Sequence, residues 1–446
     1  MFDKVLIANR GEIALRIIET CQRLGVGTVA VASEADVEDP FARAADEVRH
    51  IGPAAPRSSY LRGDVILEAA RETGAQAIHP GYGFLSENAD FAEAVREAGL
   101  VFIGPTPQTI RAVGGKLDAR ALAERAAVPV VPGTPPVFDP GEAKAAAEAM
   151  GYPVMIKASA GGGGIGMTRV DSEKKLERAL DDAKRKGASF FGSDTVYLEK
   201  FIENPAHVEV QILGDGKEVV ALGDRDCTVQ RRHQKVIEES PSPRLSEQTR
   251  QAMMAAAVRL GEACGYTNAG TVEMIYAGGG EAAGSFYFLE VNSRLQVEHP
   301  VTEMVTGLDL VEQQLRIAAG GPLPEGFKAR GHAVEARICA EDPDKRFFPS
   351  PGVLEEVHFP AAEHVRIDAG VVSGSEVSPA YDSLLAKVIA WGEDRDQALT
   401  RLRAYLGEVR ITGITTNLSL FSRVLDHEVF RRGEHDTSFL LQHLGL

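Results

Sequence analysis

The sequence predicts a mixed fold, α/β with α+β parts. A doubly wound parallel sheet at the N-terminus is followed by a small central lid and by an antiparallel-sheet C-terminal region. Short apolar runs alternate with amphipathic runs up to about residue 105, five prolines fall within residues 129–140, and alternating polar and apolar positions begin at His207. These patterns are typical of βαβ units, of a linker and of half-buried strands, respectively.

The N-terminal region is expected to form a parallel sheet covered by helices, because crossover connections join consecutive strands. We expect strands at residues 5–8, 28–32, 77–79 and 100–103, and helices at residues 12–24, 61–73 and 88–98. The first turn, Ala8–Ala14, lacks the GxGxxG spacing that lets a dinucleotide pyrophosphate approach the backbone. NAD binding is therefore not predicted.

Residues 129–140 predict a linker into a second, lid-like unit. The lid is expected to contain strands at 152–159, 167–170 and 195–201 and a charged helix at 172–186. From His207 onward, alternating segments predict antiparallel strands, with helices at 247–263 and 395–406. No internal repeat interrupts this order.

Composition restricts the possible partners. The 446 residues include 48 basic and 64 acidic side chains, a net charge of −16 that opposes binding to nucleic acid or anionic membranes. The four cysteines are scattered, without zinc spacing, which is typical of a reducing compartment. We find neither a targeting leader nor a run of ~18 apolar residues. The expectation is a cytoplasmic enzyme.

A glycine-rich run at residues 159–166 follows the apolar strand that ends at Lys157. Unhindered backbone amides beside a cation can wrap phosphate oxygens, although glycine runs also form simple hairpins. Lys157 favours the phosphate interpretation, since an unpaired ammonium in a buried strand is costly. The lysine precedes the glycines, so this is no Walker A loop.

A basic cluster at residues 230–235, Gln-Arg-Arg-His-Gln-Lys, stands out in an acidic chain. A solvated loop or a nucleic-acid patch would have the same charge. The cluster lacks interleaved aromatic residues, which disfavours nucleic acid. Small anionic substrates suit it better.

Two glutamates, Glu273 and Glu290, lie on strands that a short glycine-rich connection can pair. Their carboxylates would then face each other and could bind Mg²⁺ together with substrate phosphates, although such pairs are also common surface features.

The run from Glu290 to Glu298 alternates polar and apolar residues, so in an extended strand Glu290, Asn292, Arg294 and Gln296 share one face. A straight strand would separate its end carboxylates by roughly 26 Å, too far for one site. Either the run serves two adjoining sites, or the chain curls after Arg294. We expect the strand to bend or end near Gln296, which turns Val297 and Glu298 back toward Arg294.

Five segments resemble the biotin carboxylases of the ATP-grasp superfamily. They are Ile7-Ala-Asn-Arg-Gly-Glu-Ile-Ala, His79-Pro-Gly-Tyr-Gly-Phe-Leu-Ser-Glu-Asn, the glycine loop, Arg231-Arg-His-Gln-Lys-Val and residues 290–303. They occur in the family's order and span essentially the whole chain. The resemblance implies an N-terminal domain at 1–113, an ATP-grasp domain at 114–330 with a mobile lid at about 131–203, and a C-terminal domain at 331–446.

The resemblance also implies roles for individual residues. ATP would be bound by Lys116, Lys157, Gly161, Gly162, Gly163, Gly164, Glu199, Lys200, Ile202, His207, Gln230 and His233. Magnesium would be bound by Glu273, Glu290 and Asn292. Bicarbonate would be held by Lys235, Arg294, Gln296 and the Val297 amide, with Glu298 as its base. Biotin would lie beside Tyr82, with Arg337 stabilising its enolate.

The implied activity is ATP- and bicarbonate-dependent carboxylation of biotin through carboxyphosphate, with Mg²⁺ or Mn²⁺, as in acetyl-CoA carboxylase and fatty acid biosynthesis. The sequence has no Met-Lys-Met attachment motif, so we expect biotin on a separate carrier protein, a carboxyltransferase partner and a homodimer. The residues leave open the final acyl acceptor and whether the chain is a free subunit or part of a longer polypeptide.

Two positions depart from the family pattern, Ile165 in the glycine loop and Gly115 before Lys116. They affect expectations for nucleotide affinity, and neither removes a proposed catalytic group. Two other functions remain open from the residues: an ATP-grasp ligase that activates a carboxylate for attack by an amine, and a regulatory ATP-binding module without chemistry.

Overall fold

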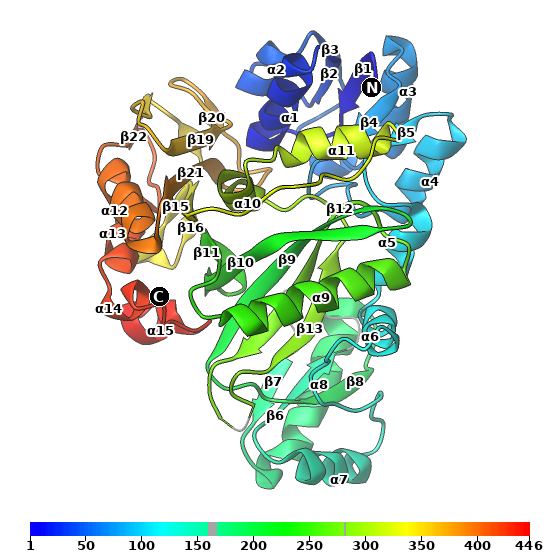
Figure 1. Cartoon of the computed structure of the whole chain (residues 1–446), viewed down its shortest axis with the longest axis vertical. Coiled ribbons are helices and arrows are strands. Elements are labelled where there is room, and N and C mark those ends of the chain that lie inside the picture. The colour runs from blue at the N-terminus through cyan, green and yellow to red at the C-terminus, as the bar shows by residue number, and fades with distance from the viewer. Residues whose placement is uncertain (159–166, 281) are drawn as a thin grey trace.

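The N-terminal region is a five-stranded parallel sheet in the order β3-β2-β1-β4-β5 (Figure 1). This structure is a computed structural model, and it describes residues 1–158, 167–280 and 282–446. The strands are β1 (Lys4–Ile7), β2 (Gly27–Ala32), β3 (Glu47–His50), β4 (Ala77–His79) and β5 (Val101–Phe102). The predicted parallel sheet is confirmed.

Helices cover both faces of this sheet, as the alternating pattern predicts. They are α1 (Gly11–Arg23), α2 (Pro40–Ala44), α3 (Gly63–Thr73), α4 (Ala89–Glu97) and α5 (Pro107–Gly114), with a 3-10 turn at Pro56–Ser58. Helix α1 buries Ile13, Ile17 and Cys21 at the period of one helical face. Helix α2 and strand β3 were not predicted from the sequence. Helix α2 is short, and β3 is a half-exposed edge strand without a continuous apolar run.

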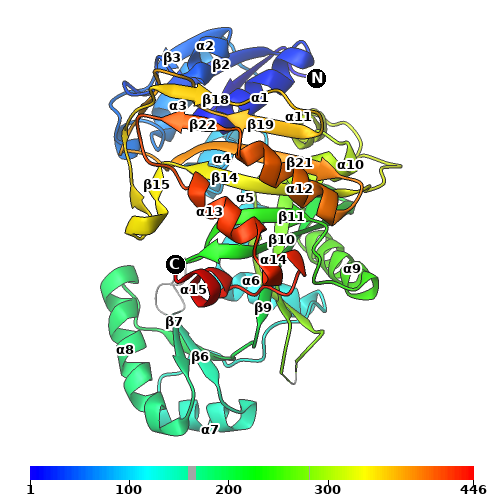
Figure 2. The same ribbon diagram turned by 90° about the vertical axis from the view of Figure 1, so that its left-hand side faces the viewer.

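The lid is a three-stranded antiparallel sheet, in the order β7-β6-β8, packed against two helices. Its elements are α7 (Pro140–Met150), β6 (Val154–Ala158), β7 (Met167–Val170), α8 (Glu173–Phe191) and β8 (Val196–Lys200). The two views show it at the end of the molecule opposite the N-terminal sheet (Figures 1 and 2). The proline-rich segment before it is non-helical up to Asp139, where α7 is capped, and it borders β8 through isolated bridges at Gly133 and Val137.

An eight-stranded antiparallel sheet, in the order β13-β12-β9-β10-β11-β14-β21-β19, forms the centre of the molecule. Its strands are β9 (Pro205–Asp215), β10 (Val219–Arg231), β11 (Gln234–Ser240), β12 (Thr267–Ala277), β13 (Phe286–Asn292), β14 (His332–Cys339), β19 (Val365–Ala369) and β21 (Leu384–Gly392). The β11–β14 pairing joins the central and C-terminal regions into one sheet, which the sequence did not predict.

Helices pack on this sheet and complete its cores. They are α6 (Lys116–Arg125), α9 (Glu247–Ala263), α10 (His299–Thr306), α11 (Leu310–Ala318), α12 (Arg395–Leu406), α13 (Leu418–Leu425), α14 (Glu428–Arg431) and α15 (Phe439–Leu444). Short pairs are β15 (Glu341–Asp342) with β16 (Phe348–Pro349), β17 (Gly352–Val353) with β20 (Glu376–Val377) and β18 (Glu356–His358) with β22 (Arg410–Thr412), and a 3-10 turn spans Pro343–Lys345. None of the described helices is both long and apolar enough to cross a membrane.

Candidate active site

One cavity of about 1410 Å³ brings together residues from the N-terminal sheet, the lid, the large sheet and the C-terminal region. It is lined by every predicted site residue that the structure describes: Tyr82, Lys116, Lys157, Glu199, Lys200, Ile202, His207, Gln230, His233, Lys235, Glu273, Glu290, Asn292, Arg294, Gln296, Val297, Glu298 and Arg337. The predicted phosphate loop, Gly161–Gly164, lies outside the described residues, as does Ile165.

A row of three carboxylates crosses the large sheet at this cavity. The strand register places Glu273 of β12 opposite Glu209 of β9 on one side and opposite Glu290 of β13 on the other. The predicted pairing of the Glu273 and Glu290 strands is thus confirmed. Like charges directly opposite each other destabilise a sheet, so this row requires cations.

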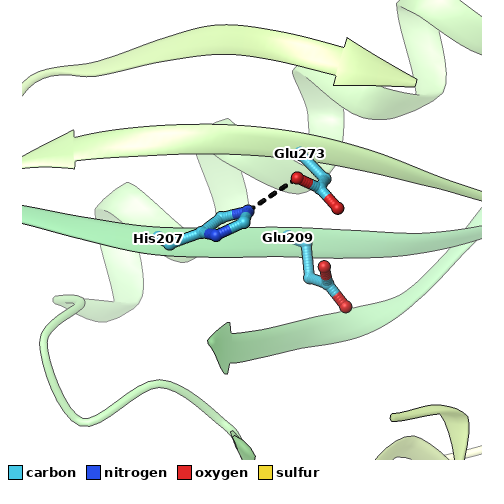
Figure 3. A group of neighbouring side chains, drawn as sticks. All are labelled: His207, Glu209 and Glu273. Carbon is cyan, nitrogen blue, oxygen red and sulfur yellow. Dashed lines mark hydrogen bonds and ion pairs between the residues drawn. The ribbon is translucent and has the colours of Figure 1, made fainter. Parts of the chain in front are cut away.

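Protein cations neutralise only part of the row. Lys235 Nζ lies 2.7 Å from Glu209 and 3.1 Å from Glu273, and His207 Nε2 lies 2.7 Å from the other oxygen of Glu273 (Figure 3). Burial and the neighbouring Glu273 raise the pKa of Glu290, and Lys116 offsets this only partly. The Glu273–Glu290 pair therefore has the hard oxygen donors and the uncompensated charge that fit a magnesium ion.

Amide side chains complete this part of the cavity. Asn292 Nδ2 donates to Glu273 Oε1 at 2.9 Å, and Gln296 Nε2 donates to the same oxygen at 3.1 Å. The Asn292 carbonyl oxygen faces away from these bonds and accepts from Arg294 at 2.9 Å. Asn292 is thus hydrogen-bonded through both polar atoms of its amide, and metal binding would have to replace the bond from Arg294.

The part of the cavity next to the lid carries a charge cluster centred on Glu199 of β8. Lys157 Nζ lies 2.5 Å from one Glu199 oxygen, and Arg120 Nη1 lies 3.0 Å from the other. Lys200 donates instead to backbone carbonyls at the end of α7, at 3.1 Å and 3.0 Å. Each oxygen of Glu199 is thus paired with a cation.

Sequence reasoning missed two residues of this cavity that side-chain spacing could have indicated. Arg120 follows Lys116 by four residues on α6, which places both on one helical face. Glu209 follows His207 by two residues on β9, which places both on one face of the strand. Helix α6 begins at Lys116, with Gly115 as its N-cap and no side-chain cap bond.

A tight turn between β10 and β11 carries the basic cluster. Arg232 and His233 both have positive φ, 48° and 69°, which non-glycine residues rarely adopt. Burial lowers the pKa of His233, and the nearby cations His207 and Lys157 lower it further. Gln230 lies behind the turn, with its Nε2 3.5 Å from His207 Nδ1. The turn thus brings Gln230, Arg231 and His233 to the cavity.

The prediction for the end of the polar strand was partly wrong. Strand β13 ends at Asn292, earlier than the expected bend near Gln296. The strand ends early because Glu87, from the N-terminal region, takes the place of a strand partner. It accepts from the Ser293 amide at 2.9 Å and from Arg294 Nε at 3.0 Å. The chain does leave the strand and starts α10 with Glu298 as its N-cap, so a straight strand is excluded.

We predicted that Glu298 turns back toward Arg294, but its carboxylate pairs with other residues. Within the described ranges its ionic partners are Lys235, at 2.5 Å from Oε1, and Arg337, at 2.9 Å from Oε2. Burial alone would raise the pKa of Glu298, but Lys235, Arg337 and Arg225 hold it well below its ordinary value. Glu298 is thus an ionised carboxylate, fully buried between the two cations assigned to bicarbonate and biotin.

The remaining end of the cavity is formed by Arg337 and the turn that carries Tyr82. Asn9, from the first motif, holds this turn by donating to the carbonyls of Pro80 and Tyr82, both at 2.7 Å. The Tyr82 hydroxyl is buried and lacks a hydrogen-bond partner among the described residues. Arg337 pairs with both Glu298 and Glu238, and Glu238 and Glu335 lie opposite each other on β11 and β14.

Comparisons with known proteins cover the whole chain. Family profiles match at residues 1–110 (Biotin carboxylase, N-terminal domain), 115–326 (Carbamoyl-phosphate synthase L chain, ATP binding domain) and 335–442 (Biotin carboxylase C-terminal domain). Biotin carboxylase 2 of Bacillus subtilis is 51% identical over 451 residues, covering 100% of both chains. Biotin carboxylase of Pseudomonas aeruginosa is 50% identical over 452 residues, covering 100% of this chain and 99% of its own.

A solved structure is also similar over its whole length. The biotin carboxylase domain dimer of Hydrogenobacter thermophilus 2-oxoglutarate carboxylase, in complex with MgADP, ADP and bicarbonate, has a TM-score of 0.92 and 43% identity. The match covers 100% of this chain and 98% of that one. These matches agree with the mixed α/β fold and with the cavity where carboxylates, lysines and arginines meet. The chain belongs to the biotin carboxylase family.

Proposed function

We propose that this chain carboxylates biotin with ATP and bicarbonate, releasing ADP and phosphate. The observation that carries the proposal is the placement of Glu298, an ionised buried base held between Lys235 and Arg337. Lys235 also contacts Glu273 of the carboxylate row, so the expected phosphate and bicarbonate positions share one cation. This arrangement suits phosphoryl transfer to a small anion.

The first step activates bicarbonate. Lys235 and Arg294 attract the anion, and Glu298 takes its proton so that a bicarbonate oxygen can attack the γ-phosphorus of ATP. The bond from this phosphorus to the β,γ-bridging oxygen breaks, which gives carboxyphosphate and ADP. Magnesium, bound by Glu273, Glu290 and Asn292, would neutralise charge on the phosphates. Lys116, Lys157 and His207 would hold the phosphate oxygens, since all three line the cavity.

The second step transfers the carboxyl group. Carboxyphosphate releases carbon dioxide and leaves phosphate, which accepts the proton of the biotin ureido nitrogen. That nitrogen then attacks carbon dioxide to form carboxybiotin. Arg337 stabilises the negative charge that develops on the ureido oxygen, and the Tyr82 hydroxyl lines the same end of the cavity. A closed lid would exclude water from the carboxyphosphate.

An ADP-release assay tests this proposal. ATP turnover should require bicarbonate and rise with free biotin or with a biotinylated carrier domain. Turnover that depends on neither compound would exclude the activity. Turnover stimulated by an amine in place of biotin would instead identify a ligase that activates a carboxylate.

We further propose a biotinylated carrier protein and a carboxyltransferase as partners, a homodimeric assembly and a cytoplasmic location. The dimeric biotin carboxylase domain of the Hydrogenobacter enzyme supports the assembly. The acyl acceptor is set by the carboxyltransferase, and acetyl-CoA is our first candidate.

The proposed domains remain 1–113, 114–330 and 331–446, with the lid at about 131–203. Co-purification with native partners and size-exclusion measurements test these assignments.

A further inference from the structure

A fully buried lysine lies directly behind the proposed bicarbonate site. Lys387 of β21 is 0% exposed, and its Nζ donates to the backbone carbonyl of Val297 at 2.9 Å. The same ammonium lies 3.2 Å from Glu12 of α1 and 3.5 Å from Asp368 of β19. Lys387 therefore connects the N-terminal domain and the C-terminal sheet to the segment that precedes Glu298.

The surroundings keep this lysine charged. Burial alone would lower the pKa of Lys387, but the carboxylates of Glu12, Asp368 and Glu335 raise it above its ordinary value. Lys387 also lies opposite Arg337 in the pairing of β21 with β14, so two cations face each other across neighbouring strands. Like charges in that position destabilise a sheet, and an apolar pair would pack there at lower cost. Stability alone therefore does not explain the lysine.

The bond to Val297 acts on Glu298 through the peptide plane. The carbonyl of Val297 and the amide nitrogen of Glu298 belong to the same planar peptide group. Fixing this carbonyl restricts the rotation of that plane and hence the direction in which the Glu298 side chain leaves the backbone. Glu298 is the N-cap of α10, where no side-chain cap bond fixes the chain. The Lys387 bond supplies a restraint at that point.

We propose that Lys387 is a positioning residue for bicarbonate activation: it holds the Val297–Glu298 peptide so that the Glu298 carboxylate stays between Lys235 and Arg337. This inference rests on the proposed biotin carboxylase activity. Lys387 does not line the cavity, whereas Val297 and Glu298 do. Loss of the Lys387 bond is thus expected to change the position of the Glu298 carboxylate and to leave the contacts with the nucleotide unchanged.

Replacing Lys387 by Met tests the inference, since the side chain keeps its bulk and loses its donor. We expect kcat/KM for bicarbonate to fall about tenfold or more, the loss typical of a charged hydrogen bond, with the Kd for ATP changed by less than about twofold. The double variant Lys387→Met/Glu12→Gln removes the lysine together with a carboxylate that it neutralises. It should show the same bicarbonate defect with better stability, and it carries the test where the single variant does not fold.

Asp368→Asn is the matched control, because it removes a counter-charge of Lys387 and leaves the bond to Val297. Its stability should fall, with kcat/KM for bicarbonate within about threefold of wild type. Constants for bicarbonate and ATP that shift by one common factor in both Lys387 variants, or that stay near wild type, would overturn the inference. Wild-type turnover without bicarbonate dependence would instead refute the proposed function.

Discussion

Replacing Glu298 by Gln removes one negative charge from a carboxylate that two cations hold. In the native site, Oε1 lies 2.5 Å from Lys235 and Oε2 lies 2.9 Å from Arg337. A glutamine keeps one acceptor but turns an NH₂ group toward the other cation, so one of these contacts becomes repulsive. It also cannot take the proton of bicarbonate. A general base contributes about 10²–10⁴-fold to the rate, and we expect kcat to fall by about 10³-fold.

Nucleotide binding should survive this change, because the cations assigned to the phosphates, Lys116 and Lys157, do not contact Glu298. The assay is ADP release at saturating bicarbonate and biotin, combined with an equilibrium titration of ATP. Glu335→Gln is a matched control, because Glu335 is as fully buried as Glu298 but does not line the cavity. The control should keep kcat within about threefold of wild type. A loss below tenfold in Glu298→Gln would refute Glu298 as the base.

Three further predictions concern the metal, acid stability and the buried core of the site. Glu290→Gln should raise the Mn²⁺ concentration needed for half-maximal activity by about tenfold or more, because the pair of carboxylates loses one ligand; an unchanged metal titration would contradict the assignment. Burial lowers the pKa of His79 to about 3, so the unfolded chain binds a proton from about pH 6.5 downward and the folded protein does not. Stability should therefore fall as the pH drops between these values, and urea midpoints should fall less in His79→Asn. Arg225→Met removes one of the two cations of the buried Glu209 and the donor to the buried Gln211, Thr271 and Thr302. It should cost about 3–5 kcal/mol in denaturant unfolding, against little change for Arg43→Met on the surface.

Local periodicity predicted much of the fold. Helices α9 and α12 begin and end at the predicted residues, since an apolar face with a 3.6-residue period is a local property. The opposition of Glu273 and Glu290 was predicted for a similar reason, because a short connection limits how two strands can pair. The candidate residues also converge on one cavity, apart from the glycine loop outside the described residues.

Long-range contacts set the features that the sequence could not predict. Strand β13 ends at Asn292 because Glu87, about two hundred residues earlier, binds the Ser293 amide. Similarly, the partners of Glu298 depend on how β11 and β14 pair, and this pairing has no local signal. Glu335 alternates with the apolar residues Val334 and Ala336 as a surface position does, yet it is fully buried. A period of two indicates which residues share a face and does not say which face is covered.

Lys235 links the proposed metal half of the site to the proposed bicarbonate half. Its ammonium lies 3.1 Å from Glu273, in the metal half, and 2.5 Å from Glu298, in the bicarbonate half. Burial alone would lower the pKa of Lys235, but Cys227 and the surrounding carboxylates raise it well above its ordinary value, so one fixed charge serves both halves. A metal ion held by Glu273 would repel this ammonium and weaken its hold on that carboxylate. The lysine would then be available to bicarbonate, so metal binding would be coupled electrostatically to activation of the second substrate.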